Sequence, residues 1–259
     1  MICAVNSEQT RRRFEAALAD PRSAGVVCQL GALEAVFGPL PGSGWRFYTG
    51  GEGEPSFALG VRGASALLVG PADAEELAGF LGFCGVQQLR TTAAVPKGWQ
   101  PKERFVRMIL PAGATLPRQP APEKIRLNEC PGVGQVTDLL CRGESLGSGA
   151  EDARDCFYSE TCTLVNHGRA LIWAAQAPEG ELVATAGAYA LWNQTAYLAG
   201  VETLQGNRGR GVGRFLVCAL ANRLAGQGNT VELLCTPERA GFYRALGFER
   251  EGEVGSFGP

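Results

Sequence analysis

The chain has 259 residues, of which 45% are hydrophobic and 19% charged, and its formal net charge is −2 at pH 7. This size allows one large or two small domains, and the composition is that of an ordinary globular protein. The near-neutral charge provides no basic field for nucleic acid or a membrane surface, and no apolar run is long enough to span a membrane. We therefore expect neither nucleic acid nor membrane as a partner.

The numbers and positions of cysteine and histidine residues limit which metal sites and which redox compartment we expect. The chain has nine cysteines, an odd number, and no Cys-x-x-Cys pair, and its single histidine is His167. Most of the cysteines lie in apolar segments, so we interpret them as small buried hydrophobic residues in a reducing compartment. At the N-terminus three arginines follow a very short apolar run, which is the wrong order for a signal peptide. We predict a cytoplasmic protein without a metal site.

The first half of the chain alternates helical and extended patterns. Helices are predicted at residues 7–19, where Ser7 is a plausible cap, and at residues 72–83, where acidic residues occupy the first turns. Apolar runs predict strands at residues 25–30, 57–69, 86–91 and 104–110. The glycine- and proline-rich stretch 38–55 is expected to be a loop.

Residues 111–122 contain four prolines and little apolar periodicity, which indicates an extended linker. We therefore predict an N-terminal α/β domain at residues 1–116, a linker at 117–123 and a second domain at 124–259.

The second half again mixes helices and strands. Helices are predicted at residues 133–146 and 152–165, and a hairpin at 170–176 and 182–191. The remaining elements are a strand at 197–203, a helix ending near 225, a strand at 231–235, a helix at 237–246 and a short strand at 248–254. This alternation indicates an α/β fold with a mixed sheet.

The most informative stretch is Thr195 to Leu216, TAYLAGVETLQGNRGRGVGRFL. A buried strand is followed by a turn rich in glycine and arginine and then by a helix. Helix N-termini leave backbone N–H groups unpaired, glycines allow close approach of a ligand, and arginines bind phosphate oxygens. The pattern predicts a site for a diphosphate.

Two nucleotide motifs fit this turn less well. A kinase- or ATPase-type loop requires a lysine followed by serine or threonine, and the three lysines of this chain all precede the turn. A dinucleotide fingerprint requires Gly-x-Gly-x-x-Gly, whereas Gly209, Gly211 and Gly213 are one residue short of it. Glu232 lies roughly where that fingerprint places its acidic residue, so an NAD-dependent enzyme stays open as an alternative.

Two motifs resemble the GNAT superfamily of N-acetyltransferases. Arg208-x-x-Gly211-x-Gly213 is similar to the R/Q-x-x-G-x-G/A loop of that family, and Gly200-Val201-Glu202-Thr203 resembles the end of its fourth strand. Downstream, Ala240-Gly241-Phe242-Tyr243-Arg244-Ala245-Leu246-Gly247-Phe248 is similar to the family's A-x-x-F-Y-x-x-L-G-F helix end. The order and separation of the motifs match, and the resemblance covers about residues 125–254.

The resemblance implies a mixed, mostly antiparallel central sheet flanked by helices and an acetyl-CoA-dependent transfer to an amine. It assigns the cofactor to the strand end and loop, namely Val201, Glu202, Thr203, Arg208, Gly209, Arg210, Gly211, Val212, Gly213 and Arg214. It also implies that Tyr243 is the general acid for the leaving thiolate, and a phenol has a suitable pKa for this role.

The general base and the acceptor are less well defined. Glu202 on the central strand is the first candidate for the base, and strand alternation places it on the face opposite Val201. His167, Asp155, Tyr158 and Glu160 are weaker candidates. The acceptor is expected to be a small-molecule or peptide amine. A catalytically inactive CoA- or acyl-CoA-binding sensor is the main alternative function.

The family usually ends with one more strand, which here leaves only residues 255–259. Residues 104–110 or a second subunit could supply the missing edge, so a homodimer is a partner that the sequence allows. The first half echoes the element order of the second and is interpreted as a degenerate copy. Its turn at residues 69–73 lacks arginine and is followed by acidic residues, so we expect it not to bind the cofactor.

Overall fold

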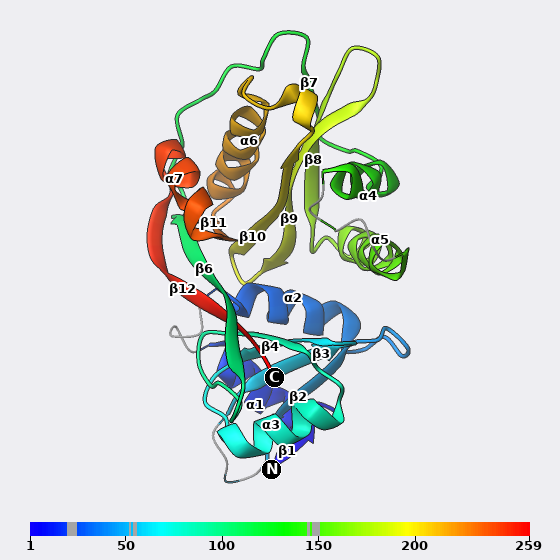
Figure 1. Cartoon of the computed structure of the whole chain (residues 1–259), viewed down its shortest axis with the longest axis vertical. Coiled ribbons are helices and arrows are strands. Elements are labelled where there is room, and N and C mark those ends of the chain that lie inside the picture. The colour runs from blue at the N-terminus through cyan, green and yellow to red at the C-terminus, as the bar shows by residue number, and fades with distance from the viewer. Residues whose placement is uncertain (20–24, 52, 54–55, 144–145, 147–150) are drawn as a thin grey trace. The chain divides into compact units, whose positions relative to one another are not determined.

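The computed structural model describes residues 1–19, 25–51, 53, 56–143, 146 and 151–259, without the side chains of 151 and 152 (Figure 1). It divides into two compact units. Unit 1 comprises Met1–Arg107, Leu234–Ala240 and Glu251–Pro259, and unit 2 comprises Met108–Leu233 and Gly241–Arg250. Two late segments thus belong to unit 1. The predicted linker at residues 117–123 lies within unit 2, and its role as a domain boundary stays a prediction.

Unit 1 is an α/β unit with a mostly antiparallel sheet. Its elements in chain order are β1 (Ile2–Ala4), α1 (Glu8–Leu18), α2 (Val27–Phe37), β2 (Arg46–Gly50), β3 (Ala58–Arg62), β4 (Ser65–Val69), α3 (Ala74–Phe83), β5 (Gln88–Thr91), most of β6 (Gln100–Leu110) and most of β12 (Glu249–Gly258). The strands from β1 to β4 pair antiparallel in sequence order, β4 pairs parallel with β5, and β12 pairs antiparallel with β5. Beyond β12 the sheet order continues with β6.

The two predicted helices of unit 1 begin at their expected caps. The Ser7 side chain accepts a hydrogen bond from the Thr10 backbone N–H, and the Thr10 hydroxyl accepts one from the Ser7 backbone N–H, which forms a capping box. Asp73 caps α3 by accepting from the N–H groups of Glu75 and Glu76 at 3.1 and 2.8 Å. Both helices bury one apolar side against the sheet, which matches their sequence pattern.

The prediction of a strand at residues 25–30 is wrong, because α2 begins at Val27. Most of this helix is buried, and it is apolar on nearly all sides. A short apolar run of this kind lacks the period that separates a strand from a buried helix. Two other predictions are refined. The run 57–69 is two strands joined at Gly63 (φ 52°), and the expected loop 38–55 contains β2, with residues 52, 54 and 55 outside the described part.

Unit 2 is built in the same way. Its elements are β7 (Arg126–Asn128), α4 (Val133–Arg142), α5 (Glu151–Asn166), β8 (Leu171–Gln176), β9 (Leu182–Trp192), β10 (Thr195–Thr203), a short 3-10 turn (Gln205–Asn207), α6 (Val212–Gly226), most of β11 (Thr230–Cys235) and most of α7 (Pro237–Leu246). The sheet order is β11-β10-β9-β8-β7; β10 pairs parallel with β11, and the β9–β10, β8–β9 and β7–β8 pairs are antiparallel. The helix predicted at 133–146 ends at Arg142, and residues 144 and 145 lie outside the described part.

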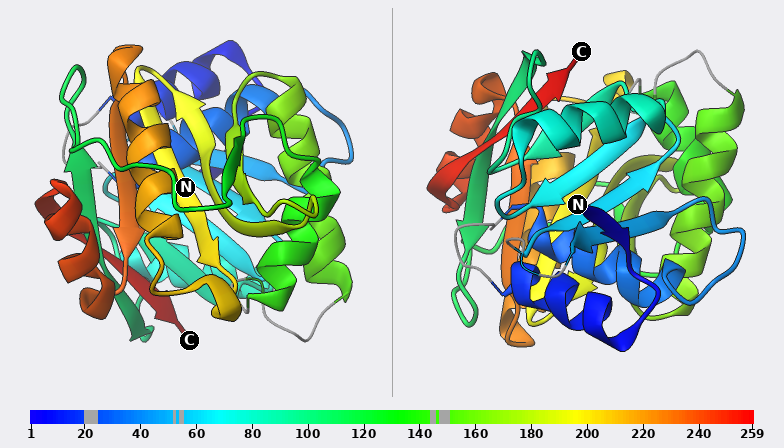
Figure 2. Two further views of the ribbon diagram at one scale, coloured as in Figure 1. Left: turned by 90° about the horizontal axis from the view of Figure 1, so that it is seen from above. Right: turned by 90° about the horizontal axis from the view of Figure 1, so that it is seen from below.

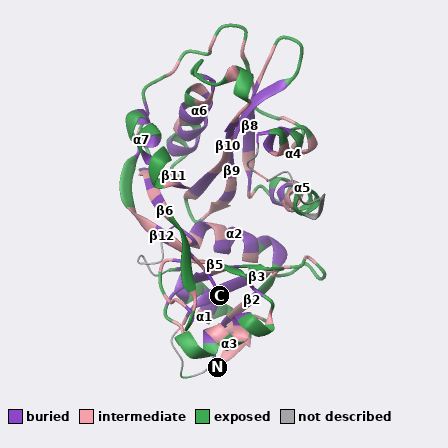
Figure 3. Ribbon diagram, in the orientation of Figure 1, coloured by how far each residue is buried: buried purple, intermediate pink, exposed green. Residues whose placement is uncertain are grey.

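The helices of unit 2 cover both faces of its sheet. Helix α6 packs on β9 and β10, and Figure 2 (left) shows it beside β10. On the other face, α4 contributes Val136, Leu139 and Leu140 to a core with Ile172 and Leu182. Figure 3 shows that the buried residues follow β8 to β10 and one side of α6. Among the described residues no helix is both long and apolar enough to cross a membrane.

The two units repeat one topology. The order β1-α1-α2-β2-β3-β4-α3-β5 in unit 1 corresponds to β7-α4-α5-β8-β9-β10-α6-β11 in unit 2, and in each series the last two strands pair parallel. The mixed α/β, mostly antiparallel fold class predicted from the sequence is therefore confirmed. The units differ at one place, because the β3–β4 register is continuous whereas the β9–β10 register shifts twice.

Candidate functional site

The centre of the candidate site is a β-bulge in β10. Ala199 lies opposite Gly187 and Glu202 lies opposite Thr185, so β10 has one more residue than β9 between these two pairs. Gly200 adopts a left-handed conformation with φ 57°. A bulge leaves its extra residue outside the ladder and turns the strand. Between Ala199 and Glu202, β10 thus has backbone groups outside its ladder with β9.

The residues after the bulge alternate between the two faces of the sheet. A Cβ atom on Gly213 of α6 would lie 3.0 Å from Thr203 Oγ1, and one on Gly143 would lie 2.2 Å from Glu202 Cγ. Thr203 therefore faces α6, and Glu202 faces the end of α4. This is the alternation expected for neighbouring strand residues.

The loop between β10 and α6 opens the N-terminus of α6. Gly209 (φ 76°) and Gly211 (φ 80°) both adopt the left-handed region that favours glycine. Gly211 is the N-cap of α6, and no side chain of the described residues caps the helix. The first N–H groups of α6 are therefore available to an anion, and the helix dipole favours negative charge there.

This loop and the end of β10 form the walls of a groove with a volume of about 470 Å³. The residues that line it are Val201, Thr203, Asn207, Arg208, Gly209, Gly211, Val212, Gly213, Arg214 and Phe242. Most of the cofactor residues predicted from the sequence are thus brought together. Asn207 and Phe242 also line the groove and were not among the predicted residues.

Arg208 ties the loop to the strand end. Its Nε donates to the Thr203 carbonyl at 2.8 Å and its Nη2 donates to Glu202 Oε1 at 3.0 Å. The same carboxylate oxygen accepts from the Thr203 backbone N–H at 3.1 Å, and Glu202 is only 7% exposed. A guanidinium has five donor hydrogens, so these two bonds leave others that can reach an anion in the groove.

A family model decides the class of this segment. Residues 135–248 match the acetyltransferase (GNAT) family. This segment is a GNAT domain. The match contains the bulge, the glycine-arginine loop and Tyr243, and it therefore confirms the resemblance on which the sequence prediction rests.

Solved structures extend the likeness to the whole chain. A tandem GNAT protein from the clavulanic acid biosynthesis pathway covers 99% of this chain and 97% of its own, with 15% identity and a TM-score of 0.63. A GCN5-related N-acetyltransferase from Sphaerobacter thermophilus covers 91% of each chain, with 14% identity and a TM-score of 0.59. These identities establish fold alone. The N-terminal half therefore has a GNAT-like fold as well, and no curated protein matches the sequence.

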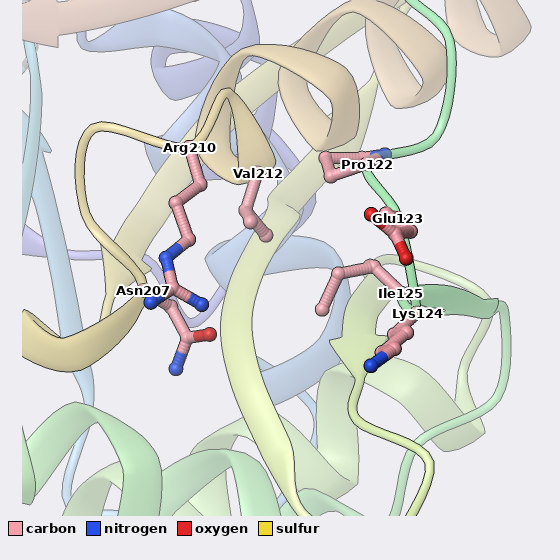
Figure 4. A pocket seen from close by; sticks show the side chains of 7 residues that line it. All are labelled: Pro122, Glu123, Lys124, Ile125, Asn207, Arg210 and Val212. Carbon is pink, nitrogen blue, oxygen red and sulfur yellow. The ribbon is translucent and has the colours of Figure 1, made fainter.

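Arg210 lies outside the groove of the GNAT domain. It borders a second cavity of about 400 Å³, which is lined by Pro122, Glu123, Lys124, Ile125, Asn207, Arg210 and Val212 (Figure 4). Asn207 and Val212 border both hollows. Arg208 and, on α6, Arg214 thus line the groove, whereas Arg210 lines the second cavity.

Tyr243, the predicted general acid, is a buried residue of α7. Its side chain is 6% exposed, and its ring makes edge contacts with Phe242 and Phe248 at centroid distances of 5.1 and 5.9 Å. Phe242, which is 39% exposed, lines the groove, whereas Tyr243 is not among the residues that do so. The catalytic role of Tyr243 stays a prediction.

The weaker base candidates of the GNAT domain lie on α5 or directly after it. His167 Nδ1 lies 2.9 Å from the Thr163 carbonyl at the exposed end of the helix, which is the position of a C-terminal cap. Asp155 pairs with Arg154 at 3.6 Å, and a hydrogen bond with Cys162 raises the pKa of the exposed Tyr158 hydroxyl. No cluster of metal-binding side chains occurs within the described part of the chain.

Tyr189 on β9 is a residue that the sequence analysis missed. A Cβ atom on Gly187 or Gly200 would come within 2.7 Å of its ring, so both glycines leave room for it. Its hydroxyl is buried and has no hydrogen-bond partner among the described residues, and burial raises its pKa. The ring therefore lies directly against the bulge of the GNAT domain.

Proposed function

We propose that the protein is an acetyl-CoA-dependent N-acetyltransferase that transfers an acetyl group directly to an amine of a small-molecule or peptide acceptor. The observation that carries this proposal is the uncapped N-terminus of α6, which opens into the groove beside the β10 bulge. The GNAT match supports the acetyltransferase class, and the choice of acetyl-CoA and of an amine is our inference from it. We assign the activity to the cytoplasm because the cysteine usage is that of a reducing compartment.

The residues of the groove fit a diphosphate. The first turn of α6 lines the groove, and Gly209 and Gly211 keep their side of the loop free of Cβ atoms. Arg214 and the remaining donors of Arg208 add positive charge. Such an arrangement binds phosphate oxygens through both hydrogen bonds and the helix dipole.

The strand end fits the amide-rich arm of the cofactor. Val201 and Thr203 line the groove beyond residues 195–197 of β10, which are the residues that pair with β11. An extended amide chain can pair with such a backbone as an added strand would. When bound, acetyl-CoA supplies the activated acetyl group as a thioester, and a backbone N–H near Val201 is suited to polarise its carbonyl.

Two side chains are assigned to proton transfer. We assign Glu202 as the base that accepts the proton of the amine. The carboxylate is buried on the α4 face and bonded to Arg208, so we expect water to relay the proton to it. We assign protonation of the thiolate to Tyr243. The place of Tyr243 outside the groove lining is the observation that favours the alternative, a CoA-binding module without transfer activity.

The N-terminal half is proposed to lack a cofactor site. At the corresponding turn, Asp73 already occupies the N–H groups of Glu75 and Glu76, and these two carboxylates add negative charge. The β3–β4 ladder also has no bulge. We assign this half the role of contacting a second subunit, so a homodimer stays part of the proposal.

The test is a titration of the protein with acetyl-CoA, CoA, NAD and ATP, read from the melting temperature. Ligands that bind the native state raise it by mass action, so acetyl-CoA and CoA are expected to raise it and NAD and ATP are not. Arg214→Gln should weaken the CoA effect, and Arg223→Gln near the far end of α6 is the matched control. A shift with NAD alone would contradict the proposal and favour the dinucleotide alternative.

Activity is tested separately with a panel of amines by release of free thiol. Tyr243→Phe should reduce turnover while CoA affinity is unchanged. Binding of CoA without thiol release from any amine would support the inactive binding module instead.

A further inference from the structure

The second cavity is formed by two segments that are far apart in the sequence. The chain just before β7 supplies Pro122–Ile125, and the loop before α6 supplies Asn207 and Arg210 together with Val212 (Figure 4). None of the first four residues belongs to a GNAT motif. The cavity adjoins the groove, because Asn207 and Val212 border both.

Two cations border the cavity from opposite sides. Figure 4 shows Arg210 and Asn207 on one side and Lys124 on the other. Neither Lys124 nor Arg210 takes part in an ion pair with any residue that the structure describes. Both side chains are exposed, so their charges are available to a ligand without breaking an existing contact.

Lys124 is held in an unfavourable backbone conformation. Its φ is 60°, in the left-handed region that residues with a side chain seldom adopt. Such conformations cluster at ligand-binding positions. The adjacent Glu123 also lines the cavity, and its carboxylate opposes an anion there.

The walls between the cations are apolar. The side chains of Ile125 and Val212 point toward one another across the cavity, and Pro122 lies at its edge (Figure 4). Apolar walls with an amide such as Asn207 suit a flat heterocycle that also makes polar contacts. Together with two separated cations they suit a nucleoside that carries phosphate at two positions.

We propose that this cavity binds the nucleotide end of CoA and that Lys124 recognises its 3′-phosphate, whereas Arg210 faces the diphosphate. This inference rests on the proposed function, because it places the other end of the same ligand in the groove. It makes Lys124 a specificity-determining residue that separates CoA from 3′-dephospho-CoA.

The test compares CoA with 3′-dephospho-CoA by isothermal titration of the full-length protein. The wild type should bind CoA about tenfold more tightly, since one charge-assisted contact is worth about that factor. Lys124→Gln should remove this preference and leave the affinity for 3′-dephospho-CoA within about twofold, because no 3′-phosphate contact is lost. Arg210→Gln should weaken both ligands by a similar factor.

Two variants serve as controls of opposite kind. Glu123→Gln removes the opposing carboxylate and should increase the preference for CoA. Arg126→Gln removes an exposed cation that does not line the cavity and should change neither affinity. A loss of preference in Arg126→Gln equal to that in Lys124→Gln would overturn the proposal, because it would indicate a general effect of charge.

Adenosine 3′,5′-bisphosphate and inorganic phosphate separate the nucleotide from a free anion. The bisphosphate should compete with CoA in the wild type and about tenfold less well in Lys124→Gln. Competition by inorganic phosphate at equal concentration would overturn the assignment to a nucleotide. Equal affinity of the wild type for CoA and 3′-dephospho-CoA would overturn this inference and leave the proposed function standing, whereas failure of both to bind would overturn the two together.

Discussion

At the scale of single residues, the carboxylate of Glu202 connects the end of β10 to the loop that follows it. One of its oxygens accepts hydrogen bonds from the Thr203 N–H and from Arg208, whose guanidinium also reaches the Thr203 carbonyl. The carboxylate is buried, and the guanidinium is more than half exposed. Removing the exposed guanidinium would leave the buried carboxylate without its positive partner, and a buried charge without a partner is destabilising.

Arg208→Gln should therefore weaken both the fold and the site. We expect the free energy of unfolding to fall by about 1–2 kcal/mol, less than for a fully buried pair because solvent screens the guanidinium. Acetyl-CoA affinity should fall as well, since the loop loses its attachment. Urea unfolding and titration calorimetry measure the two effects. Arg214→Gln is the comparison: it should lower affinity alone, and an equal loss of stability there would contradict this account.

Tyr189→Phe removes a buried hydroxyl that has no partner among the described residues. Because an unsatisfied buried polar group costs about 1–3 kcal/mol, the variant should be as stable as the wild type or more stable, with an increase of about 1 kcal/mol. Thermal and urea unfolding of both proteins provide the measurement. A clear loss of stability would mean that the hydroxyl has a partner in solution.

Glu34 on α2 makes stability depend on pH. Its pKa is raised chiefly by burial, while Arg11 lowers it and Glu15 raises it further. A carboxyl whose folded-state pKa lies above its unfolded value contributes stability that is present below the unfolded pKa and is lost as pH rises through the folded pKa. Glu34→Gln should therefore be more stable than the wild type at pH 7, and the difference should shrink toward pH 4. Unfolding curves at both pH values check this, and a constant difference would contradict it.

At the scale of elements, α3 and α6 show one topology with two kinds of N-terminus. Asp73 caps α3 and satisfies its first N–H groups, whereas α6 starts at Gly211 without a side-chain cap from the described residues. In a capped helix these N–H groups are hydrogen-bonded to the cap, which stabilises the helix. An uncapped helix keeps them for a ligand, and its end is less stable until the ligand binds.

Asp73→Ala should separate the two uses. The loss of the cap should lower the stability of the protein by about 1 kcal/mol. CoA affinity should be unchanged, because the proposed site lies at α6. Chemical unfolding and calorimetric titration give both values, and a change in CoA affinity beyond about twofold would be inconsistent with a site confined to unit 2.

The elements that the sequence predicted well have a clear local signal. Helix α7 begins at Pro237, a favourable first position, and α1 and α3 begin after Ser7 and Asp73. The missed elements lack such a signal. Helix α2 is apolar nearly all round and has no side-chain cap, and β2 lies inside a stretch dominated by glycine and proline.

The candidate site was predictable where it depends on backbone and not where it depends on contacts. The glycines at 209 and 211 indicate a left-handed turn before a helix, so the position of the loop could be predicted from the sequence. The Glu202–Arg208 pair could not, because it depends on how the chain turns between them. The same holds for Lys124, which lines one cavity with Arg210 and was predicted only as the first residue of the second domain.

At the scale of the whole molecule, unit 1 depends on the last described segment of the chain. Residues 255–257 of β12 pair with residues 89–91 of β5, and Gln88 donates a hydrogen bond to Ser256. Val254 and Ser256 are buried in this arrangement. The N-terminal sheet is therefore completed by residues that follow the GNAT domain in the sequence.

Truncation after Arg250 should destabilise unit 1 in particular. Without β12, the edge of β5 loses its partner, so the backbone amides of residues 89–91 should exchange hydrogen faster, while those of β9 should change little. Hydrogen exchange read by mass spectrometry measures both regions in one experiment. Equal protection of β5 in the two proteins would contradict this dependence.

The pairing of β5 with β12 also bears on how the chain folds as it leaves the ribosome. Gln88 and Ser256 are 168 residues apart, so at the usual rates of synthesis the edge of β5 waits roughly 10–30 s for its partner strand. During that interval the N-terminal half has an open strand edge, which is a site for pairing with other nascent chains. The order in which the chain is made thus favours completion of the C-terminal GNAT domain before the half that precedes it.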